Sequence, residues 1–410
     1  MRANSRYGRG GRTGRGPLHG ALRLPGIGHN SGGGVRNVAD WSFQDASLDL
    51  LFTNQIAAMN GLIVPFSPLL TMVRSSLADY ADTSAGLWLS FAANTPRLTD
   101  KGLLVEESRI NLALWCRDLT NAAWVKTTMS AAKTAVGIDG AANSATTITA
   151  SGALSTILQT VVQASTADTV SFFVKRRTGT GTVEVTADDV AWTDITAALA
   201  TAGANWYRAT ISATLVNPVI GVRITTDTDA VDVDFAQLEA GTFATSPILT
   251  TTVAATRAAD VVTVTTPPSF GGVATLFASA VPAQAAAQSG TVLSWNDGTN
   301  NNRLALFRQS DHQPVAQVVR AGVAEANFGF GANWNDLARR KMAIAVAEND
   351  VAACVNGGSV VTDVNVTPPS ISTLAVGSSA GGSFFNGRIE RVAIFNGARL
   401  SGGRLQSITG

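Results

Sequence analysis

The sequence predicts an all-β protein with two tandem antiparallel β-sandwiches of the jelly-roll type, after an extended Arg/Gly-rich N-terminal arm and an irregular base region. Apolar and polar residues alternate over most of the chain after residue 110, and Gly, Asn and Asp interrupt the alternation at short intervals. No helix of convincing length follows from the pattern. We expect the arm at residues 1–39, the base at 40–109, and the sandwiches at 110–250 and 257–410.

The composition fits exposed sheets with few charges. The chain has 410 residues, which is room for about two to three domains. Only 14% of the residues are charged, so Thr, Ser, Asn, Gly and Ala must cover much of the surface. The net charge of +1 gives no overall field that would attract a polyanion, so nucleic acid is not an expected partner.

The arm lacks Asp and Glu and interleaves seven arginines with eleven glycines. Such a segment buries too little apolar surface to order itself, so we expect a partner to hold it. Three interpretations remain: a solvated tail, a nucleic-acid segment, and a segment that docks on a protein surface. We favour docking, because guanidinium groups pair well with carboxylates and only Tyr7 is available to stack bases. The expected anchoring residues are Arg2, Arg6, Arg9, Arg12, Arg15 and Arg23.

The base region is interrupted by Pro65, Pro68 and Pro96, and it contains only short candidate strands, at residues 47–52 and 87–91. It shows no pattern typical of catalysis. We expect residues 40–101 to form a collar or an oligomer contact.

Period-two alternation is clear in both sandwiches. In the first, Val170, Phe172 and Val174 share one face of a strand, and a long strand begins at Tyr207. The second contains turn signals between its apolar runs. These signals are Asn296-Asp297-Gly298, Asn356-Gly357-Gly358 and Asn386-Gly387.

The sequence predicts no catalytic site, metal site or cofactor. Two of the three histidines, His19 and His29, fall in the arm, and His312 falls in a turn. The two cysteines, Cys116 and Cys354, are far apart in apolar surroundings and are expected to be free, buried thiols.

Three carboxylate pairs are candidates for acid/base catalysis, because glycosidases use such pairs. They are Asp232 with Asp234, Asp188 with Asp189, and Glu106 with Glu107. Asp232 and Asp234 share a strand face, but Ala236 and Leu238 follow on that face in place of a third carboxylate, so we expect solvated strand residues or a cation contact. Glu106 and Glu107 stand close to Arg109, and we expect a structural ion pair there.

Tryptophan indoles are natural platforms for sugar rings, and three of the eight tryptophans are candidates. Trp295 and Trp334 stand beside amides and carboxylates near turns, and Trp206 falls on the polar face of its strand. The alternative for each is core packing. The predicted glycan-binding residues are Trp295, Asn296, Asp297, Trp334, Asn335 and Trp206.

Several stretches of the chain together form a recognisable pattern. In the N-terminal half these are residues 74–76, 92–97, 102–112 and 119–126. Further on they are residues 170–175, 206–208, 236–248 and 256–260. Together they resemble a signature of structural proteins of tailed bacteriophages and prophages. Residues 375–379 and 385–395 are similar to the last strands of concanavalin A-like, laminin-G-type jelly rolls, although Arg388-Ile389-Glu390-Arg391 stands where that ending usually has an Asp-Glu pair.

The resemblance implies a tail fibre, tail appendage or head spike of a virion that displays carbohydrate-binding-like sandwiches. We therefore expect residues 1–101 to contact other virion proteins, and the sandwiches to attach to host-surface polysaccharide. We also expect a homo-oligomer, a trimer or, for a head spike, a pentamer. The alternatives are a decoration or adaptor protein without a ligand and, less favoured, a polysaccharide depolymerase. Since residues 62–73 are short and broken by prolines, we expect no membrane insertion, and the basic N-terminus lacks the apolar core of a secretory signal.

Overall fold

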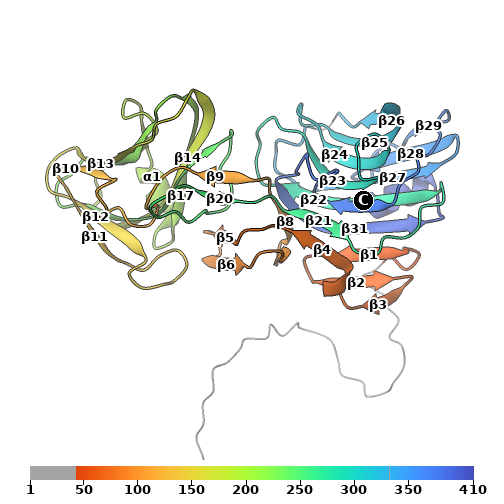
Figure 1. Ribbon diagram of the computed structural model, residues 1–410, viewed down its shortest axis with the longest axis horizontal. Coiled ribbons are helices and arrows are strands. Elements are labelled where there is room, and N and C mark those ends of the chain that lie inside the picture. The colour runs from red at the N-terminus through yellow and green to blue at the C-terminus, as the bar shows by residue number, and fades with distance from the viewer. Residues whose placement is uncertain (1–42, 332) are drawn as a thin grey trace, which may run out of the picture. The chain divides into compact units, whose positions relative to one another are not determined.

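The computed structural model describes residues 43–331 and 333–410 (Figure 1). The predicted arm at residues 1–39 and its arginines lie outside this part of the chain. The described residues are nearly all β, and the predicted fold class of antiparallel β-sandwiches is confirmed. Their two α-helices are short: α1 (Thr196–Ala202) and α2 (Gly402–Thr409).

The first sandwich consists of two five-stranded antiparallel sheets. The order in one is β10 (Val125–Thr127), β13 (Ser155–Thr160), β18 (Val219–Ile224), β15 (Val183–Thr186) and β16 (Trp192–Asp194). The order in the other is β11 (Met129–Ala135), β12 (Ala145–Ala150), β19 (Ala230–Ala240), β14 (Thr166–Thr178) and β17 (Tyr207–Leu215). Their alternating apolar residues, among them Ile157, Val222 and Phe172, are buried in one core.

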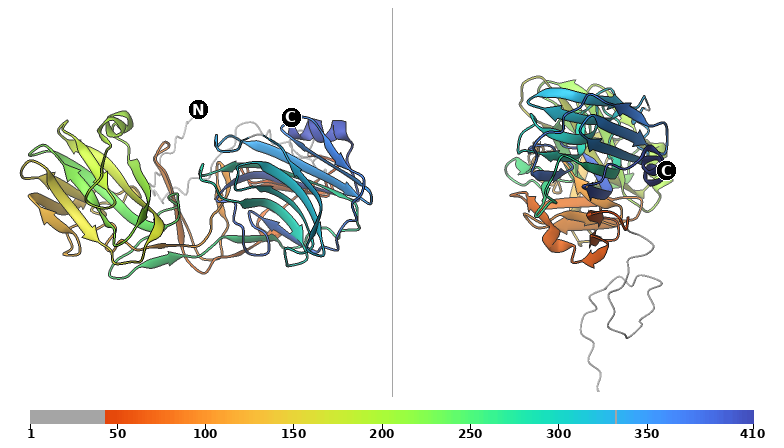
Figure 2. Two further views of the ribbon diagram at one scale, coloured as in Figure 1. Left: turned by 90° about the horizontal axis from the view of Figure 1, so that it is seen from above. Right: turned by 90° about the vertical axis from the view of Figure 1, so that its right-hand side faces the viewer.

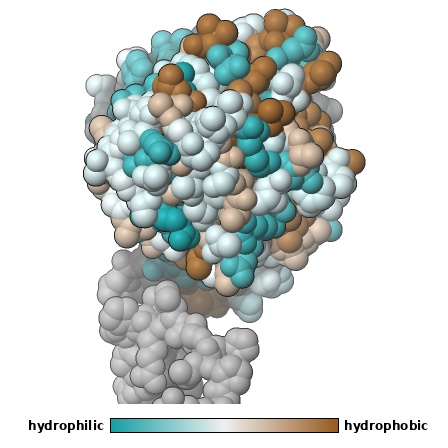
Figure 3. Space-filling model, turned by 90° about the vertical axis from the view of Figure 1, so that its left-hand side faces the viewer, coloured by the Kyte–Doolittle hydropathy of each residue, from teal (hydrophilic) through white to brown (hydrophobic). Residues whose placement is uncertain are grey.

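The surface of this sandwich matches the composition. Figure 3 faces it and shows mostly near-neutral residues, with hydrophobic residues gathered along the upper and right-hand margins. Thr, Ser, Gly and Ala make up much of the sequence of its sheets, so this surface carries few charged residues.

The second sandwich consists of a ten-stranded and a seven-stranded sheet. The first contains β29 (Val361–Asp363), β28 (Asp350–Val355), β27 (Arg340–Ala347), β22 (Ala274–Pro282), β31 (Gly387–Asn396), β1 (Leu48–Leu51), β2 (Ile56–Met59), β3 (Leu62–Val64), β7 (Arg97–Thr99) and β8 (Gly102–Val105). The other contains β26 (Val323–Gly329), β25 (Pro314–Arg320), β24 (Arg303–Arg308), β23 (Gly290–Asn296), β30 (Thr373–Val376), β21 (Val261–Val264) and β4 (Leu70–Val73). Helix α2 packs on β27 and β28 (Figure 2).

The base region is a correction to the sequence analysis. It is not irregular, because six of its strands complete the second sandwich: β1 pairs with β31, β4 with β21, and β8 with β31. Leu48, Leu50 and Phe52 are buried in the same core as the C-terminal strands. These six strands have three or four residues each. Three of them, β1, β4 and β8, find partners far along the chain, so local patterning does not show that pairing.

The remaining strands of the base region form a separate hairpin, β5 (Ala78–Asp82) and β6 (Leu87–Phe91). Trp88 of this hairpin stacks on Phe235 of β19, with ring centroids 5.1 Å apart. The hairpin therefore covers part of the outer face of the first sandwich.

A two-stranded ribbon connects the first sandwich to the rest of the chain. The chain enters through β9 (Arg109–Asn111) and leaves through β20 (Ala255–Arg257), and these two strands pair with each other (Figure 1). The first sandwich is therefore an insertion between two halves of the second. No helix of the described residues is long and apolar enough to cross a membrane.

Candidate functional site

The ribbon is held by a buried ion network, which we call the joint network and define as Arg74, Arg97, Glu106, Arg257 and Asp260. Arg74 pairs with Asp260 at 2.9 Å, and Arg97 pairs with Glu106 at 2.7 Å and also with Asp260. Arg257 lies 3.5 Å from Glu106. The side chains of all five are at most 7% exposed, so water screens these pairs little.

Hydrogen bonds tie this network to both sandwiches. The backbone N–H of Ser246 donates to Glu106 Oε1 at 3.0 Å, and Arg97 donates to the Ser246 hydroxyl at 2.9 Å. Burial raises the pKa of Glu106, but the charges of Arg257 and Arg97 and the Ser246 N–H outweigh it and lower that pKa to about 2. Glu106 is therefore an ionised structural group and not a general acid.

The joint network explains the resemblance stretches in physical terms. Its five residues come from four separate stretches, residues 74–76, 92–97, 102–112 and 256–260, which the fold brings together. Glu107 pairs with Arg109, so the ion-pair role expected for Glu106 and Glu107 is confirmed. These motif residues build a joint between sheets.

Asn111, from the same stretch as Glu106, and Gln237, from residues 236–248, also have structural roles. The Asn111 amide donates to the carbonyls of Ala236 and Ile248, and its oxygen accepts the N–H of Leu238. Gln237 donates to Glu239 and accepts the N–H of Ile248. Both side chains are buried and satisfy backbone groups that no strand partner reaches.

The expectation of solvated carboxylates at Asp232 and Asp234 is wrong. Both are buried: Arg177 pairs with Asp232 at 2.8 Å, and Arg117 pairs with Asp234 at 2.7 Å. The alternation places both correctly on the outer face of β19, but it does not show that neighbouring arginines cover that face. Burial raises the pKa of Asp234 despite its bonds to Arg117. Each carboxylate has its own cationic partner, so the two do not form an acid/base pair.

Trp295 and Trp334 are not sugar platforms, which corrects the sequence prediction. Both are fully buried in the core of the second sandwich. Trp295 packs edge-on against Phe270 at 5.2 Å, and the indole N–H of Trp334 donates to the Ala338 carbonyl at 2.7 Å. The core-packing alternative holds for both, because the indole faces that a sugar needs are covered by protein.

The polar residues beside these two tryptophans lie in or next to turns and stabilise them. Asn296 is buried and accepts the N–H of Gly298 at 2.8 Å. Asp297 is exposed, but it accepts hydrogen bonds from Thr299 and Asn302 within its own turn. Asn335 is exposed at a turn whose geometry Asn333 fixes.

Trp206 is the predicted tryptophan that remains accessible. It directly precedes β17 and is half-buried, and the ammonium of Lys175 lies 4.7 Å from the centre of its ring. It lines a cavity of about 540 Å³, which we call the Trp206 groove. The groove is lined by Thr83, Ser84, Ala198, Thr201, Ala202, Asn205, Trp206 and Tyr207.

The lining of the Trp206 groove suits a neutral, hydroxylated ligand. Helix α1 and the turn between β5 and β6 supply the hydroxyls of Thr201 and Ser84, and Asn205 supplies an amide. An aromatic face packs against the C–H groups of a sugar, while amides and hydroxyls bond its O–H groups. Local sequence indicated Trp206 but not the turn at Thr83 and Ser84, which is more than 100 residues away.

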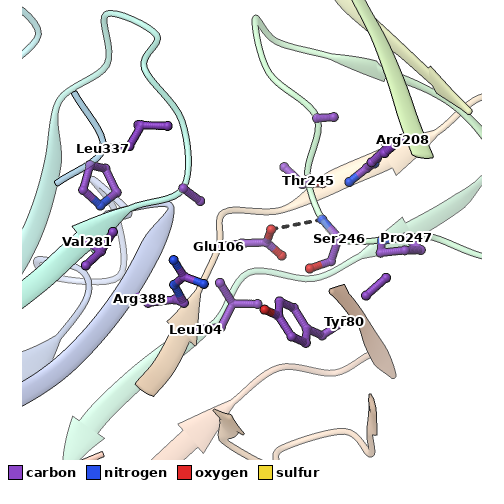
Figure 4. Close-up of a pocket in the computed structure, with 14 residues that line it drawn as sticks. Tyr80, Leu104, Glu106, Arg208, Thr245, Ser246, Pro247, Val281, Leu337 and Arg388 are labelled. Carbon is purple, nitrogen blue, oxygen red and sulfur yellow. Dashed lines mark hydrogen bonds between the residues drawn. The ribbon is translucent and has the colours of Figure 1, made fainter. Parts of the chain in front are cut away.

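A second hollow, the joint cavity, lies beside the joint network (Figure 4). Its volume is about 280 Å³. Figure 4 shows Glu106 between Arg388 of β31 and Arg208 of β17, with Tyr80 below and Ser246 beside it. The sequence analysis missed this cavity, because its lining comes from four strands of the two sandwiches, from β5 of the separate hairpin, and from loops.

In the described part of the chain, no group of three or more His, Cys, Asp or Glu could hold a metal ion. His312 Nδ1 lies 2.5 Å from an Arg308 guanidinium nitrogen in its turn. Cys116 and Cys354 are free and buried, as predicted. Burial raises the pKa of the Cys116 thiol to about 11, so it stays protonated near neutral pH.

A scan of known protein families finds no match to this chain, and a search of curated proteins finds none either. Solved structures do show partial likeness. A Ruminococcus gnavus IT-sialidase CBM40 bound to α2,3-sialyllactose is 17% identical, with a TM-score of 0.30, and the match covers 34% of this chain and 83% of that one. Domain 4 of AbnA from Geobacillus stearothermophilus, in complex with arabinotriose, is 14% identical, covering 37% and 73%, with a TM-score of 0.30. Mouse laminin α1 domains LG4-5 are 10% identical, covering 59% and 85%, with a TM-score of 0.22. At these values the likeness carries no argument about function.

Proposed function

We propose that this protein is a virion appendage, a tail fibre or a head spike, that attaches to host-surface glycan. The observation that carries the binding part is the Trp206 groove. It joins an accessible indole to an amide and hydroxyls in a cavity of about 540 Å³. The virion part rests on the resemblance of residues 74–260 to phage structural proteins. Trp206 stands within one of those stretches, residues 206–208.

The proposed arrangement has one anchored end and one displayed end. Residues 1–39 carry the arginines that would dock on a capsid, portal or tail protein, and the sandwiches would face the host. A homo-oligomer would present several Trp206 grooves at once, and linked weak sites bind at high effective concentration. Carboxylates with separate arginine partners, such as Asp232 and Asp234, support binding without hydrolysis.

The glycan-binding test compares two tryptophans whose rings each contact a cationic side chain, Lys175 for Trp206 and Arg223 for Trp192. Trp206→Ala removes the groove wall, whereas Trp192→Ala removes an indole that Arg223 covers at 4.2 Å on the opposite sheet. Full-length protein coupled to beads at high density is measured for binding to host cells and to a glycan array. We expect Trp206→Ala to lower retention at least about tenfold and Trp192→Ala to leave it unchanged. Equal retention by all three proteins contradicts the assignment of binding to the Trp206 groove. No binding at high valency contradicts the attachment role and leaves a decoration or adaptor protein.

The anchoring part has its own test. We expect particles assembled with a chain that lacks residues 1–36 to contain none of this protein, while the purified truncated chain keeps both sandwiches folded by circular dichroism. Particles that keep the truncated chain contradict the docking role of the arm.

A further inference from the structure

Two arginines that line the joint cavity lack a carboxylate partner among the described residues. Arg208 donates to the Ser171 hydroxyl at 3.0 Å and lies over the Phe173 ring, and its buried Nε has no hydrogen-bond partner there. Arg388 has no ion pair within this part of the chain. The arginines behind the cavity differ, because Arg74, Arg97 and Arg257 each face a carboxylate of the joint network.

The charges around the cavity therefore do not balance. Arg208 and Arg388 join the three arginines of the joint network, against the carboxylates of Glu106, Asp260 and Glu239. Asp79 of β5 also interacts electrostatically with Arg97, and with its carboxylate counted one positive charge remains in surplus. Glu239 does not compensate Arg208 directly, since its oxygens accept bonds from Gln237 and Thr245. Arg208 and Arg388 are half-buried, and only Nε of Arg208 is fully buried without a hydrogen-bond partner. Partial burial of a guanidinium group without a carboxylate is costly, and an anion in the cavity removes that cost.

We propose that the joint cavity binds the carboxylate of an acidic sugar, so that the attached glycan contains uronic acid. This inference rests on the proposed function and names the class of glycan. Trp206 and Arg208 are two residues apart and lie on one face, each opposite its β14 partner, Lys175 and Phe173. Strand geometry places them roughly 7 Å apart along the chain, so neighbouring residues of one oligosaccharide reach both.

The chemistry of the lining favours a carboxylate on a sugar ring. The planar guanidinium fork matches the two oxygens of a carboxylate. The hydroxyls of Ser246 and Tyr80 face the cavity, and Leu104 and Val281 provide apolar contact for C–H groups (Figure 4). A volume of about 280 Å³ is at the small end of ligand sites, which suits one sugar unit.

The test uses the full chain and a matched pair of ligands. An oligogalacturonate and its fully methyl-esterified form differ only in the methyl group that caps each carboxylate and removes its charge, and each is titrated by calorimetry. We expect the acid to bind at least about tenfold more tightly than the ester. Arg208→Gln and Arg388→Gln should each remove most of that preference, and Arg223→Gln, on the opposite sheet, should keep it. Arg208→Lys, which keeps the charge but not the fork, should restore part of it.

A thermal-shift measurement on the wild-type chain keeps the inference testable even if the Arg208 and Arg388 variants misfold. Free galacturonate should raise the thermal midpoint of the wild-type chain, and methyl galacturonate should not. Equal shifts by the two sugars overturn the inference. So does an equal shift by inorganic phosphate or sulfate, because the cavity would then be a general anion site.

The two proposals fail in distinguishable ways. Binding of neutral oligosaccharides that Trp206→Ala abolishes, with no preference for the acid, overturns the uronate inference and leaves glycan attachment standing. Absence of binding by any glycan overturns both. Acid preference that survives both arginine substitutions overturns the assignment to the joint cavity.

Discussion

The two sandwiches of this protein are built in opposite ways. The first is one continuous segment of chain that enters and leaves through a paired ribbon, β9 and β20. The second is assembled from residues on both sides of that insertion, since β1 pairs with β31 across more than 300 residues. The contrast shows that a domain can look like two separate regions in the sequence when another domain interrupts it.

The largest expected effect follows from this difference. A fragment of residues 110–257 keeps all ten strands of its sheets and should fold alone, although it loses the Trp88 contact. A fragment of residues 258–410 lacks β1, β4 and β8, so its core is open where Leu48, Leu50 and Phe52 belong. We expect a cooperative thermal transition for the first fragment and none for the second. Circular dichroism melts check both.

Residues 43–410 serve as the control for that experiment. Adding residues 43–109 as a separate chain should restore structure to the 258–410 fragment, because they supply the missing strands. A cooperative transition of residues 258–410 alone would show that the base region is an accessory to that sandwich, and the comparison would fail.

The sequence revealed the fold class, but it did not reveal that the first sandwich is inserted into the second. Alternation of single residues is local, so it predicted the sheets and put Trp206 on the polar face of its strand. The partner of Leu48–Leu51 is not local, and three or four residues carry too little pattern to identify Arg391–Ile394 as their neighbours. Turn chemistry suggested exposed indoles at Trp295 and Trp334, but burial depends on which sheet covers the strand.

The candidate sites show the same limit. Trp206 was found from its strand face, whereas the joint cavity combines Tyr80, Arg208 and Arg388 from three distant segments. Single motifs could not reveal it. The signature stretches did mark the place, because several of their residues converge on the joint network.

The next effect in size concerns how strongly each sandwich depends on buried charges. Arg97→Met leaves Glu106 and Asp260 short of a partner at a buried site, and we expect a loss of about 3–5 kcal/mol in the free energy of unfolding. Arg320→Met breaks a pair whose arginine is 46% exposed on the second sandwich, and should cost less than about 1 kcal/mol. Urea denaturation measures both. Similar losses would mean that the joint network does not hold the halves of the second sandwich together.

The smallest effect is a pH dependence that belongs to the joint and not to either sheet. The folded-state pKa of Glu106 is about 2, below its ordinary value of 4.5, because Arg257 and Arg97 outweigh burial. A lowered folded-state pKa adds stability above pH 4.5, and this stability is lost as pH falls from about 4.5 to 2. The contribution is at most about 3 kcal/mol. Unfolding free energies of wild type and Glu106→Gln, measured at steps from pH 6 to pH 2.5, isolate it.

We expect the two stability curves to approach each other as the pH falls, because the variant lacks the titrating group. Asp82, whose pKa is also lowered to about 2 beside Lys101, titrates in both proteins and cancels in the difference. The buried carboxyl of Asp234, whose pKa is raised, cancels in the same way. Parallel curves over the whole range would show that Glu106 is not held as a carboxylate by Arg97 and Arg257.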